Sequence, residues 1–129
     1  NTVSGLLGIS GISSDMRELI AVYKENPRAR LAIDVFCYRA RKYLGAYLAA
    51  LQGADAVIFS GGIGEPLALI REEIWGGMDW CGLILDDGQN DSVIGKEGCI
   101  STAEARIEVF VIPSDEEAII ARATAILLQ

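Results

Sequence analysis

Residues 57–67, Val-Ile-Phe-Ser-Gly-Gly-Ile-Gly-Glu-Pro-Leu, combine residue types that could bind a phosphate group. An apolar run stops at two glycines, and a helical pattern follows in which Pro66 suits the first turn. Backbone N–H groups at a strand-to-helix junction attract an anion, and glycine lets it approach closely. The glycines match neither a P-loop nor the dinucleotide fingerprint. The alternative interpretation is a tight turn that binds no ligand.

A second junction of this kind is expected at residues 111–117, where an apolar strand is followed by acidic residues. Ser114 and Glu117 have the spacing of a capping box, and Asp115 favours a helix N-terminus through the helix dipole. No role in capping the helix is expected for Glu116. Its carboxylate could hold Mg²⁺ opposite a phosphate, because Mg²⁺ prefers oxygen ligands. The alternative is that Glu116 is one more surface acid.

A third candidate is the segment Ser13-Ser14-Asp15-Met16-Arg17. The structural interpretation is that Asp15 caps a helix, with Glu18 three residues on, and that Arg17 is exposed. The functional interpretation is that Asp15 accepts hydrogen bonds from a ribose or a base. Arg17 would then stack its planar guanidinium on an adenine or pair with a phosphate.

Composition narrows the classes of function. The 129 residues suggest one domain, and the net charge of −7 argues against a general nucleic-acid binder. No run reaches the roughly 18 apolar residues of a membrane span. With no histidine and three cysteines outside any CxxC pattern, a zinc site is not expected. The thiols are interpreted as buried or idle in a reducing cytosol, which predicts a cytoplasmic protein.

These candidate sites need elements to position them, and the pattern predicts an α/β domain with parallel strands covered by helices. The expected elements are a loop over 1–14, helices over 15–23, 28–52 and 65–76, strands over 56–60 and 107–113, a short apolar segment at 83–85, a polar loop over 86–98 and a last helix over 114–128. The strands do not alternate, so both are expected to be central and buried on two faces. Two strands make a poor sheet, so neighbouring strands are expected from sequence outside this chain.

The helix over 28–52 is expected to be amphipathic, because apolar residues recur at intervals of three and four. Its apolar stripe comprises Leu31, Val35, Phe36, Ala40, Tyr43, Leu44, Tyr47, Leu48 and Leu51. The chain begins with Asn1 rather than Met, which we interpret as a processed piece or a fragment of a longer chain.

Four segments, in order and spacing, resemble the acetate and propionate kinases. They are GISGISSDMREL at 8–19, RARLAIDVFCYRARKYLGAYLAAL at 28–51, VIFSGGIGE at 57–65 and VFVIPSDEEAIIAR at 109–122. The resemblance covers nearly the whole chain but only the C-terminal third of a family member. It implies that residues 1–129 are the C-terminal part of the second, nucleotide-binding domain, a partial ribonuclease H-like fold related to actin, sugar kinases and heat-shock ATPases, with that domain's N-terminal strands missing.

The resemblance also implies an activity. The family transfers the γ-phosphoryl group of ATP to a short-chain carboxylate with Mg²⁺, giving an acyl phosphate and ADP, and the reaction is reversible. By segment match, Asp15, Met16 and Arg17 correspond to the adenosine-binding segment. The second nucleotide loop corresponds to Gly62, Ile63, Gly64, Glu65 and Pro66, and the magnesium-binding glutamate to Glu116. Family members form homodimers through this region.

Two departures from the family pattern matter. Pro66 stands where the family usually has Asn, which removes a side-chain amide and a backbone N–H. The family's substrate arginines, catalytic aspartate and phosphate-loop histidine would all precede Asn1, so the chain alone is expected to be inactive. The alternatives left open are a non-catalytic nucleotide-binding module and a dimerisation module.

Overall fold

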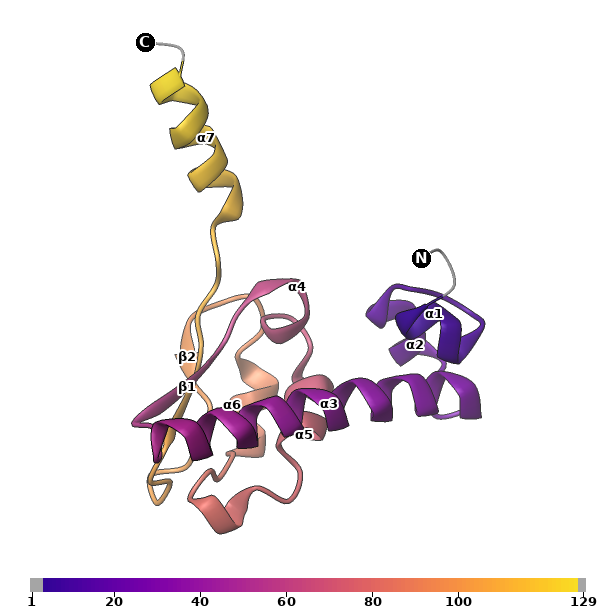
Figure 1. The fold of residues 1–129 in the computed structure, drawn as a ribbon, viewed down its shortest axis with the longest axis horizontal. Coiled ribbons are helices and arrows are strands. Elements are labelled where there is room, and N and C mark those ends of the chain that lie inside the picture. The colour runs from indigo at the N-terminus through magenta and orange to yellow at the C-terminus, as the bar shows by residue number, and fades with distance from the viewer. Residues whose placement is uncertain (1–3, 128–129) are drawn as a thin grey trace.

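The computed structural model describes residues 4–127, apart from the side chains of Glu116, Glu117 and Ile119. The helices are α1 (Gly5–Ser10), α2 (Met16–Ala21), α3 (Pro27–Leu51), α4 (Gly61–Gly64), α5 (Ala68–Trp75), the 3-10 turn η1 (Asp79–Cys81), α6 (Asp87–Ser92) and α7 (Glu116–Leu127). The strands are β1 (Ala56–Phe59), β2 (Gly98–Cys99) and β3 (Glu108–Val111). Figure 1 shows α1 and α2 at one end of the long helix α3, with the sheet at its other end.

The sheet has the order β1-β3-β2. β1 and β3 are parallel, as expected, with Ala56 opposite Glu108 and Phe59 opposite Val111. β2 pairs antiparallel with β3, so the sheet is mixed, which the sequence pattern did not predict. β1 is not buried on two faces as expected, because its residues alternate between exposed and half-buried. Its central position, expected with strands from outside this chain, stays a prediction. β1 forms one edge of the described sheet, and its Ile58 is 57% exposed.

The predicted long helix is confirmed as α3, which starts and ends at local signals. The side chain of Asn26 accepts hydrogen bonds from the N–H groups of Arg28 and Ala29, and Pro27 occupies the first turn. At the other end Gln52 adopts a left-handed conformation with φ 60°, so the helix stops at Leu51, one residue earlier than expected.

The predicted apolar stripe of α3 is confirmed in part, because Phe36, Ala40, Leu44 and Leu48 pack against the buried interior. The buried residues are Ala29, Ala32, Ile33 and Cys37, whereas the large stripe residues Leu31, Tyr43, Tyr47 and Leu51 are exposed. The most buried residues of α3 belong to a cluster that α2 and α5 complete, and they were not part of the predicted stripe. Hydrophobic spacing alone did not distinguish the two faces, because both carry apolar residues at helical intervals.

Two clusters of buried side chains form the interior. The first joins α2, α3 and α5 and consists of Met16, Leu19, Ala29, Ala32, Ile33, Cys37, Ile70 and Ile74. The second surrounds the sheet and consists of Trp75, Met78, Leu83, Val93, Ile100, Ile107, Val109 and Val111. Phe59, at the end of β1, packs against both clusters, and its ring centroid lies 6.0 Å from that of Trp75. The end of β1 is therefore anchored between two packed regions.

Three further expectations are corrected. The loop predicted over 1–14 contains α1, and the polar loop predicted over 86–98 contains α6. α6 starts where the Asp86 carboxylate accepts the N–H of Gln89, a polar cap that looked like loop composition. The helix predicted over 65–76 begins only at Ala68, and Pro66 lies in the turn before it.

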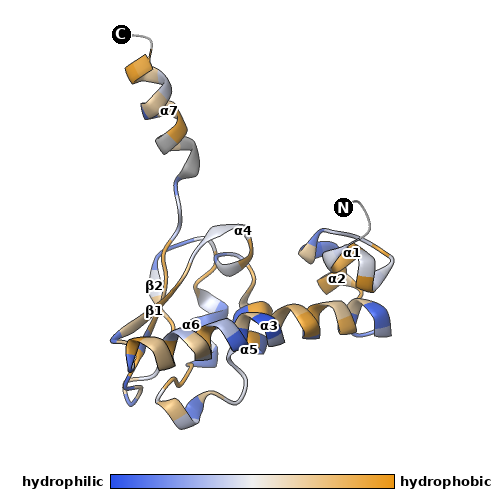
Figure 2. Cartoon of the chain, in the orientation of Figure 1, coloured by the Kyte–Doolittle hydropathy of each residue, from blue (hydrophilic) through white to orange (hydrophobic). Residues whose placement is uncertain are grey.

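The last helix, α7, extends away from the body of the molecule (Figure 1). Its Ile120, Ile126 and Leu127 are exposed, and Figure 2 shows apolar stretches along α7 in orange. The predicted end of this helix at Leu128 lies outside the described residues. None of the described helices is both long enough and apolar enough to cross a membrane.

Candidate functional site

The glycine segment after β1 forms the single helical turn α4 rather than a turn that precedes a helix. Gly61 has φ 77°, a left-handed conformation that favours glycine. At Gly64 an added Cβ would lie 3.3 Å from Cβ of Phe59, tighter than an ordinary contact. The fold itself therefore explains the glycines at these two positions.

Gly62 differs from its neighbours. Its φ lies outside the left-handed region, an added Cβ would meet no atom within 4 Å, and the residue is exposed. Neither backbone conformation nor packing requires a glycine at this position. A missing side chain here keeps the surface open to a close approach by another molecule.

A groove brings two of the three candidate segments together. It has a volume of about 500 Å³ and is lined by Ser14, Asp15, Met16, Arg17, Gly62, Ile63 and Leu67. One wall comes from the start of α2, and the other comes from α4 and the residue before α5. Segments some 45 residues apart in the sequence thus line a common surface. Its lining includes the polar or charged side chains of Ser14, Asp15 and Arg17, and Gly62, which has no side chain.

The α2 wall is held by Asp15, which is the helix N-cap as predicted. Its Oδ1 accepts the N–H of Arg17 at 2.8 Å, and its Oδ2 lies 2.8 Å from the Arg17 guanidinium. The Asp15 N–H donates to Ser13 Oγ, at the position where a capping box would use Glu18. The hydrogen bond from the Arg17 side chain lowers the pKa of Asp15, and the same bond raises the pKa of Arg17. This pair places a carboxylate and a guanidinium side by side in the lining of the groove.

Glu65 connects the two strand-to-helix junctions. Its Oε1 accepts the N–H of Gly61 at 2.6 Å and the N–H and Oγ–H of Ser114 at 2.7 and 3.0 Å. Ser60 Oγ adds a longer contact at 3.4 Å. The Ser114 N–H, followed by the Gly61 N–H, lowers the pKa of Glu65, so the side chain stays ionised. The junction after β1 and the junction after β3 therefore meet at one carboxylate.

The capping box predicted for α7 is wrong at Ser114. Asp115, not Ser114, makes the capping bond, because its Oδ1 accepts the N–H of Ala118 at 2.9 Å. Ser114 instead donates to Glu65. The side chain of Glu116, the predicted magnesium ligand, lies outside the described part of the structure. Among the described residues no group of three or more Asp, Glu, His or Cys could hold a metal ion.

Arg71 is a site residue that sequence reasoning missed. It is fully buried, and its guanidinium donates to the carbonyl oxygens of Gly64 and Glu65, each at 2.8 Å. It also donates to Asn90 Oδ1 and to the carbonyls of Asn90 and Val93. Burial lowers its pKa, and Asp91 opposes that shift. No sequence signal marked this arginine, which lies in a run that reads as an ordinary helix.

Two sets of hydrogen bonds thus hold the glycine turn. Arg71 donates to the carbonyls of Gly64 and Glu65, and the Glu65 carboxylate accepts from Gly61 and Ser114. Pro66 follows directly, where the backbone leaves the turn toward α5. The predicted site residues Gly62, Ile63, Gly64, Glu65 and Pro66 therefore occupy one fixed segment beside the groove, of which Gly62 and Ile63 line the groove itself.

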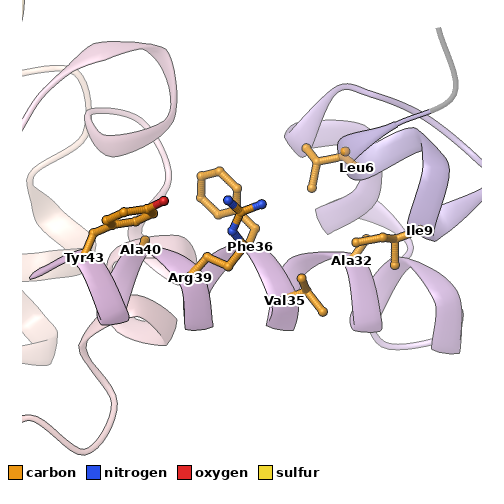
Figure 3. Close-up of a pocket in the computed structure, with 9 residues that line it drawn as sticks. Leu6, Ile9, Ala32, Val35, Phe36, Arg39, Ala40 and Tyr43 are labelled. Atoms are coloured by element: carbon orange, nitrogen blue, oxygen red, sulfur yellow. The ribbon is translucent and has the colours of Figure 1, made fainter. Parts of the chain in front are cut away.

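A second groove lies between α1 and α3 and has a volume of about 430 Å³. Figure 3 shows its lining side chains, mostly apolar, with Arg39 as the cation. None of the predicted site residues belongs to this lining. Its few polar groups make it a poorer match for a charged ligand than the groove beside Gly62.

The cysteines take no part in the candidate site. Cys37 is buried in the first core cluster, and burial raises the pKa of its thiol to about 12. Cys81 is half-buried and Cys99 is exposed, and all three are free thiols. Of the thiols interpreted as buried or idle, Cys37 is buried, whereas nothing in the structure tests whether the exposed Cys99 is idle.

Comparison with known proteins identifies strong similarity along nearly the whole chain. The model of the acetokinase family matches residues 1–122. The acetate kinase of Solibacter usitatus is 53% identical over 126 residues, and that of Methanosarcina thermophila is 49% identical over 125 residues. These matches cover 96% of this chain but 30% of each relative, so the chain spans about a third of the length of the curated relatives it matches.

Comparison with solved structures also finds acetate and propionate kinases. The acetate kinase of Porphyromonas gingivalis superposes with a TM-score of 0.86 at 43% sequence identity, covering 98% of this chain and 32% of that one. The propionate kinase of Francisella tularensis gives a TM-score of 0.81 at 36% identity, with 92% and 30% covered. The predicted α/β fold class is thereby confirmed.

Proposed function

The chain belongs to the acetokinase family, and from that premise we propose that it is the nucleotide-binding, C-terminal third of a longer kinase. That kinase transfers the γ-phosphoryl group of ATP to acetate or propionate, giving an acyl phosphate and ADP, and the reaction runs in both directions. The observation that carries the proposal is the groove lined jointly by Asp15–Arg17 and Gly62–Ile63. Two segments chosen from the sequence as nucleotide contacts line that single groove.

The groove suits the adenosine end of a nucleotide. Its volume of about 500 Å³ lies within the range of small-molecule sites. Ile63 and Leu67 offer apolar surface for a base, and the Arg17 guanidinium offers a flat cation at the rim. The bare surface at Gly62 leaves room for the sugar or a phosphate to approach the backbone.

The proposed Mg²⁺ contact is Glu116, the first residue of α7. One carboxylate does not make a magnesium site by itself, but Mg²⁺ is commonly held by one or two carboxylates together with substrate phosphates. Glu116 lies two residues after Ser114, and Ser114 donates hydrogen bonds to Glu65 in the glycine turn. The backbone of Glu116 therefore lies near that turn. This placement supports Glu116 as the residue that would hold Mg²⁺, and the ion would supply positive charge that neutralises a nucleotide phosphate.

Phosphoryl transfer depends mainly on positioning and charge stabilisation. In this proposal the described residues bind and orient the nucleotide: Asp15 and Arg17 at the rim, Gly62 at the open backbone and Ile63 beneath the base. The groups that bind the acyl substrate and act on the transferred phosphoryl belong to the rest of the longer protein. A cytoplasmic homodimer is part of the same proposal.

The activity test compares the longer protein, expressed from the reading frame upstream of Asn1, with the 129-residue chain alone. We expect Mg–ATP and acetate or propionate to give acyl phosphate, trapped as a hydroxamate, with the longer protein only. An inactive longer protein that binds Mg–ATP calorimetrically would favour the non-catalytic nucleotide module, and no binding would favour a dimerisation piece. Acyl phosphate formed by the 129-residue chain alone would contradict the expectation that this chain lacks the catalytic groups.

Glu116→Ala in the longer protein separates metal binding from helix capping. We expect it to lower Mg²⁺-dependent turnover at least tenfold with little change in melting temperature. Asp115→Ala is the matched neighbour, since it removes the bond to the Ala118 N–H, and it is expected to lower the melting temperature more than turnover. Equal effects of the two substitutions on turnover would contradict the assignment of Glu116.

A further inference from the structure

We propose that Glu65 is a positioning residue, whose carboxylate fastens the start of α7 to the glycine turn and so sets where the second junction faces the nucleotide. This inference rests on the proposed function and changes the role of Glu65 in it. The sequence resemblance makes Glu65 a nucleotide contact. The geometry points to an internal tie between two parts of the site.

The first argument is the set of hydrogen bonds on one oxygen. Glu65 Oε1 accepts from Gly61 on the β1 side and twice from Ser114 on the β3 side. These partners lie 4 and 49 residues away in the sequence. A carboxylate with backbone N–H and hydroxyl donors on both sides holds them at a fixed separation.

The second argument is that, within the described part of the chain, α7 has little else to hold it. Its described residues from Ile120 to Leu127 are exposed, and Figure 1 shows the helix standing clear of the body. Among the described groups, every hydrogen bond that joins residues 113–127 to the rest of the chain ends on Glu65 Oε1. The bond from Ile112 N–H to the Phe59 carbonyl is the last contact of the sheet before them. Among the described residues, Glu65 is therefore the side chain that links the start of α7 to the glycine turn.

The third argument is electrostatic. A carboxylate beside a polyphosphate is repelled by it, so a direct contact between Glu65 and a nucleotide phosphate is unfavourable. The same carboxylate is stabilised when it accepts hydrogen bonds within the protein, and those bonds lower its pKa. A role inside the protein agrees with the sign of the charge, whereas a role as a phosphate ligand does not.

The test uses the longer protein with Glu65→Ala, Glu65→Gln and Ser114→Ala, and with Glu97→Gln as the control. Glu97 is an exposed glutamate with no hydrogen bond in the described structure, and it lies outside the site. Three quantities are measured: kcat and KM for Mg–ATP, the Mg²⁺ concentration that gives half-maximal rate, and hydrogen exchange of the peptide spanning residues 112–118.

We expect Glu65→Ala to accelerate exchange in residues 112–118 and to lower kcat at least tenfold. The half-maximal Mg²⁺ concentration should rise, and KM for the acyl substrate should stay unchanged. Glu65→Gln should lie between Glu65→Ala and wild type. Ser114→Ala combined with Glu65→Ala should be no worse than Glu65→Ala alone, because both remove one tie. A purely structural role would lower the melting temperature without changing the Mg²⁺ dependence.

Other outcomes overturn the proposal. The wild type could be active while the Glu65 and Ser114 variants match Glu97→Gln in hydrogen exchange and in Mg²⁺ dependence. In that case Glu65 does not position the start of α7, although the proposed function stands. If Glu65→Ala fails to fold, Ser114→Ala alone decides, because it keeps the carboxylate and removes one donor. A wild-type protein that neither binds Mg–nucleotide nor turns over refutes the proposed function itself, whatever exchange shows.

Discussion

At the scale of single residues, the sequence identified the groove residues better than it identified their roles. Asp15 was predicted as an N-cap and is one, because a short acid before a helix has a local, sequence-readable partner in the N–H two residues on. The capping role predicted for Ser114 is wrong, and the hydrogen bonds between Ser114 and Glu65 were not predicted, because the two residues lie 49 positions apart in the sequence. Arg71 escaped notice for the same reason, since its acceptors come from two separate segments, residues 64–65 and 90–93.

The glycines provide the sharpest residue-scale prediction. Gly62→Ala should leave stability unchanged or raise it by about 0.4–1 kcal/mol, because the position is unstrained and open. It should also weaken Mg–ATP binding, because the added methyl group lies on the groove surface. Calorimetric titration and urea unfolding measure the two effects. Gly61→Ala is the control and should be destabilising, since φ is 77° there. Unchanged nucleotide affinity in a folded Gly62→Ala protein would remove Gly62 from the site.

The lowered pKa of Glu65 predicts that the stability of the folded protein depends on pH. Its pKa in the folded protein is lowered, so its stabilising contribution is present above pH 4.5, the ordinary value for glutamate, and is lost as pH falls through the lowered pKa. The difference in urea midpoint between wild type and Glu65→Gln should therefore shrink as pH falls below 4.5. Glu97→Gln, tested alongside, corrects for the general effect of removing one charge. A difference that is constant over this range would contradict the ionised tie.

At the scale of elements, local signals predicted the long helices and the parallel strands, and packing decided the rest. Asn26 and Pro27 mark the start of α3 in the sequence, and the structure starts it there. The most buried residues of α3 could not be read in the same way, because apolar residues recur around the helix and contact with α1, α2 and α5 selects which of them are buried. α1 and α6 were missed because glycine and acidic residues surround them, which is also typical of loops.

Arg71 carries the element-scale prediction, because it joins α4, α5 and α6. Replacing it by alanine leaves five buried or half-buried hydrogen bonds unmade, and each acceptor left without a donor costs about 1–3 kcal/mol. We expect Arg71→Ala to unfold the protein or lower its urea midpoint severely. Arg71→Lys should recover part of the loss, since it keeps a charge but has fewer donors. Arg122→Ala, at an exposed position in α7, should have little effect. Similar stability of Arg71→Ala and Arg122→Ala would refute this role.

At the scale of the whole molecule, two packed clusters meet at Phe59, and the candidate groove lies beside the turn that follows it. The outer side of β1 and the apolar residues of α7 are exposed in the described structure. The chain spans about 30% of the length of the acetate kinases it matches, so these surfaces are expected to contact the rest of the longer protein. The α/β class and the sheet-to-helix junctions were predictable from local patterns, whereas the edge position of β1 depends on strands that no local pattern contains.

The most direct measurement of the central claim is photolabelling with 8-azido-ATP in the presence of Mg²⁺, followed by mass-spectrometric mapping of the labelled peptides. The base is expected in the groove between α2 and α4, so the label should appear in peptides containing Ser14–Arg17 or Gly62–Leu67 and should be suppressed by excess Mg–ATP. Label confined to other peptides, such as those lining the groove of Leu6, Phe36 and Tyr43, would contradict the account.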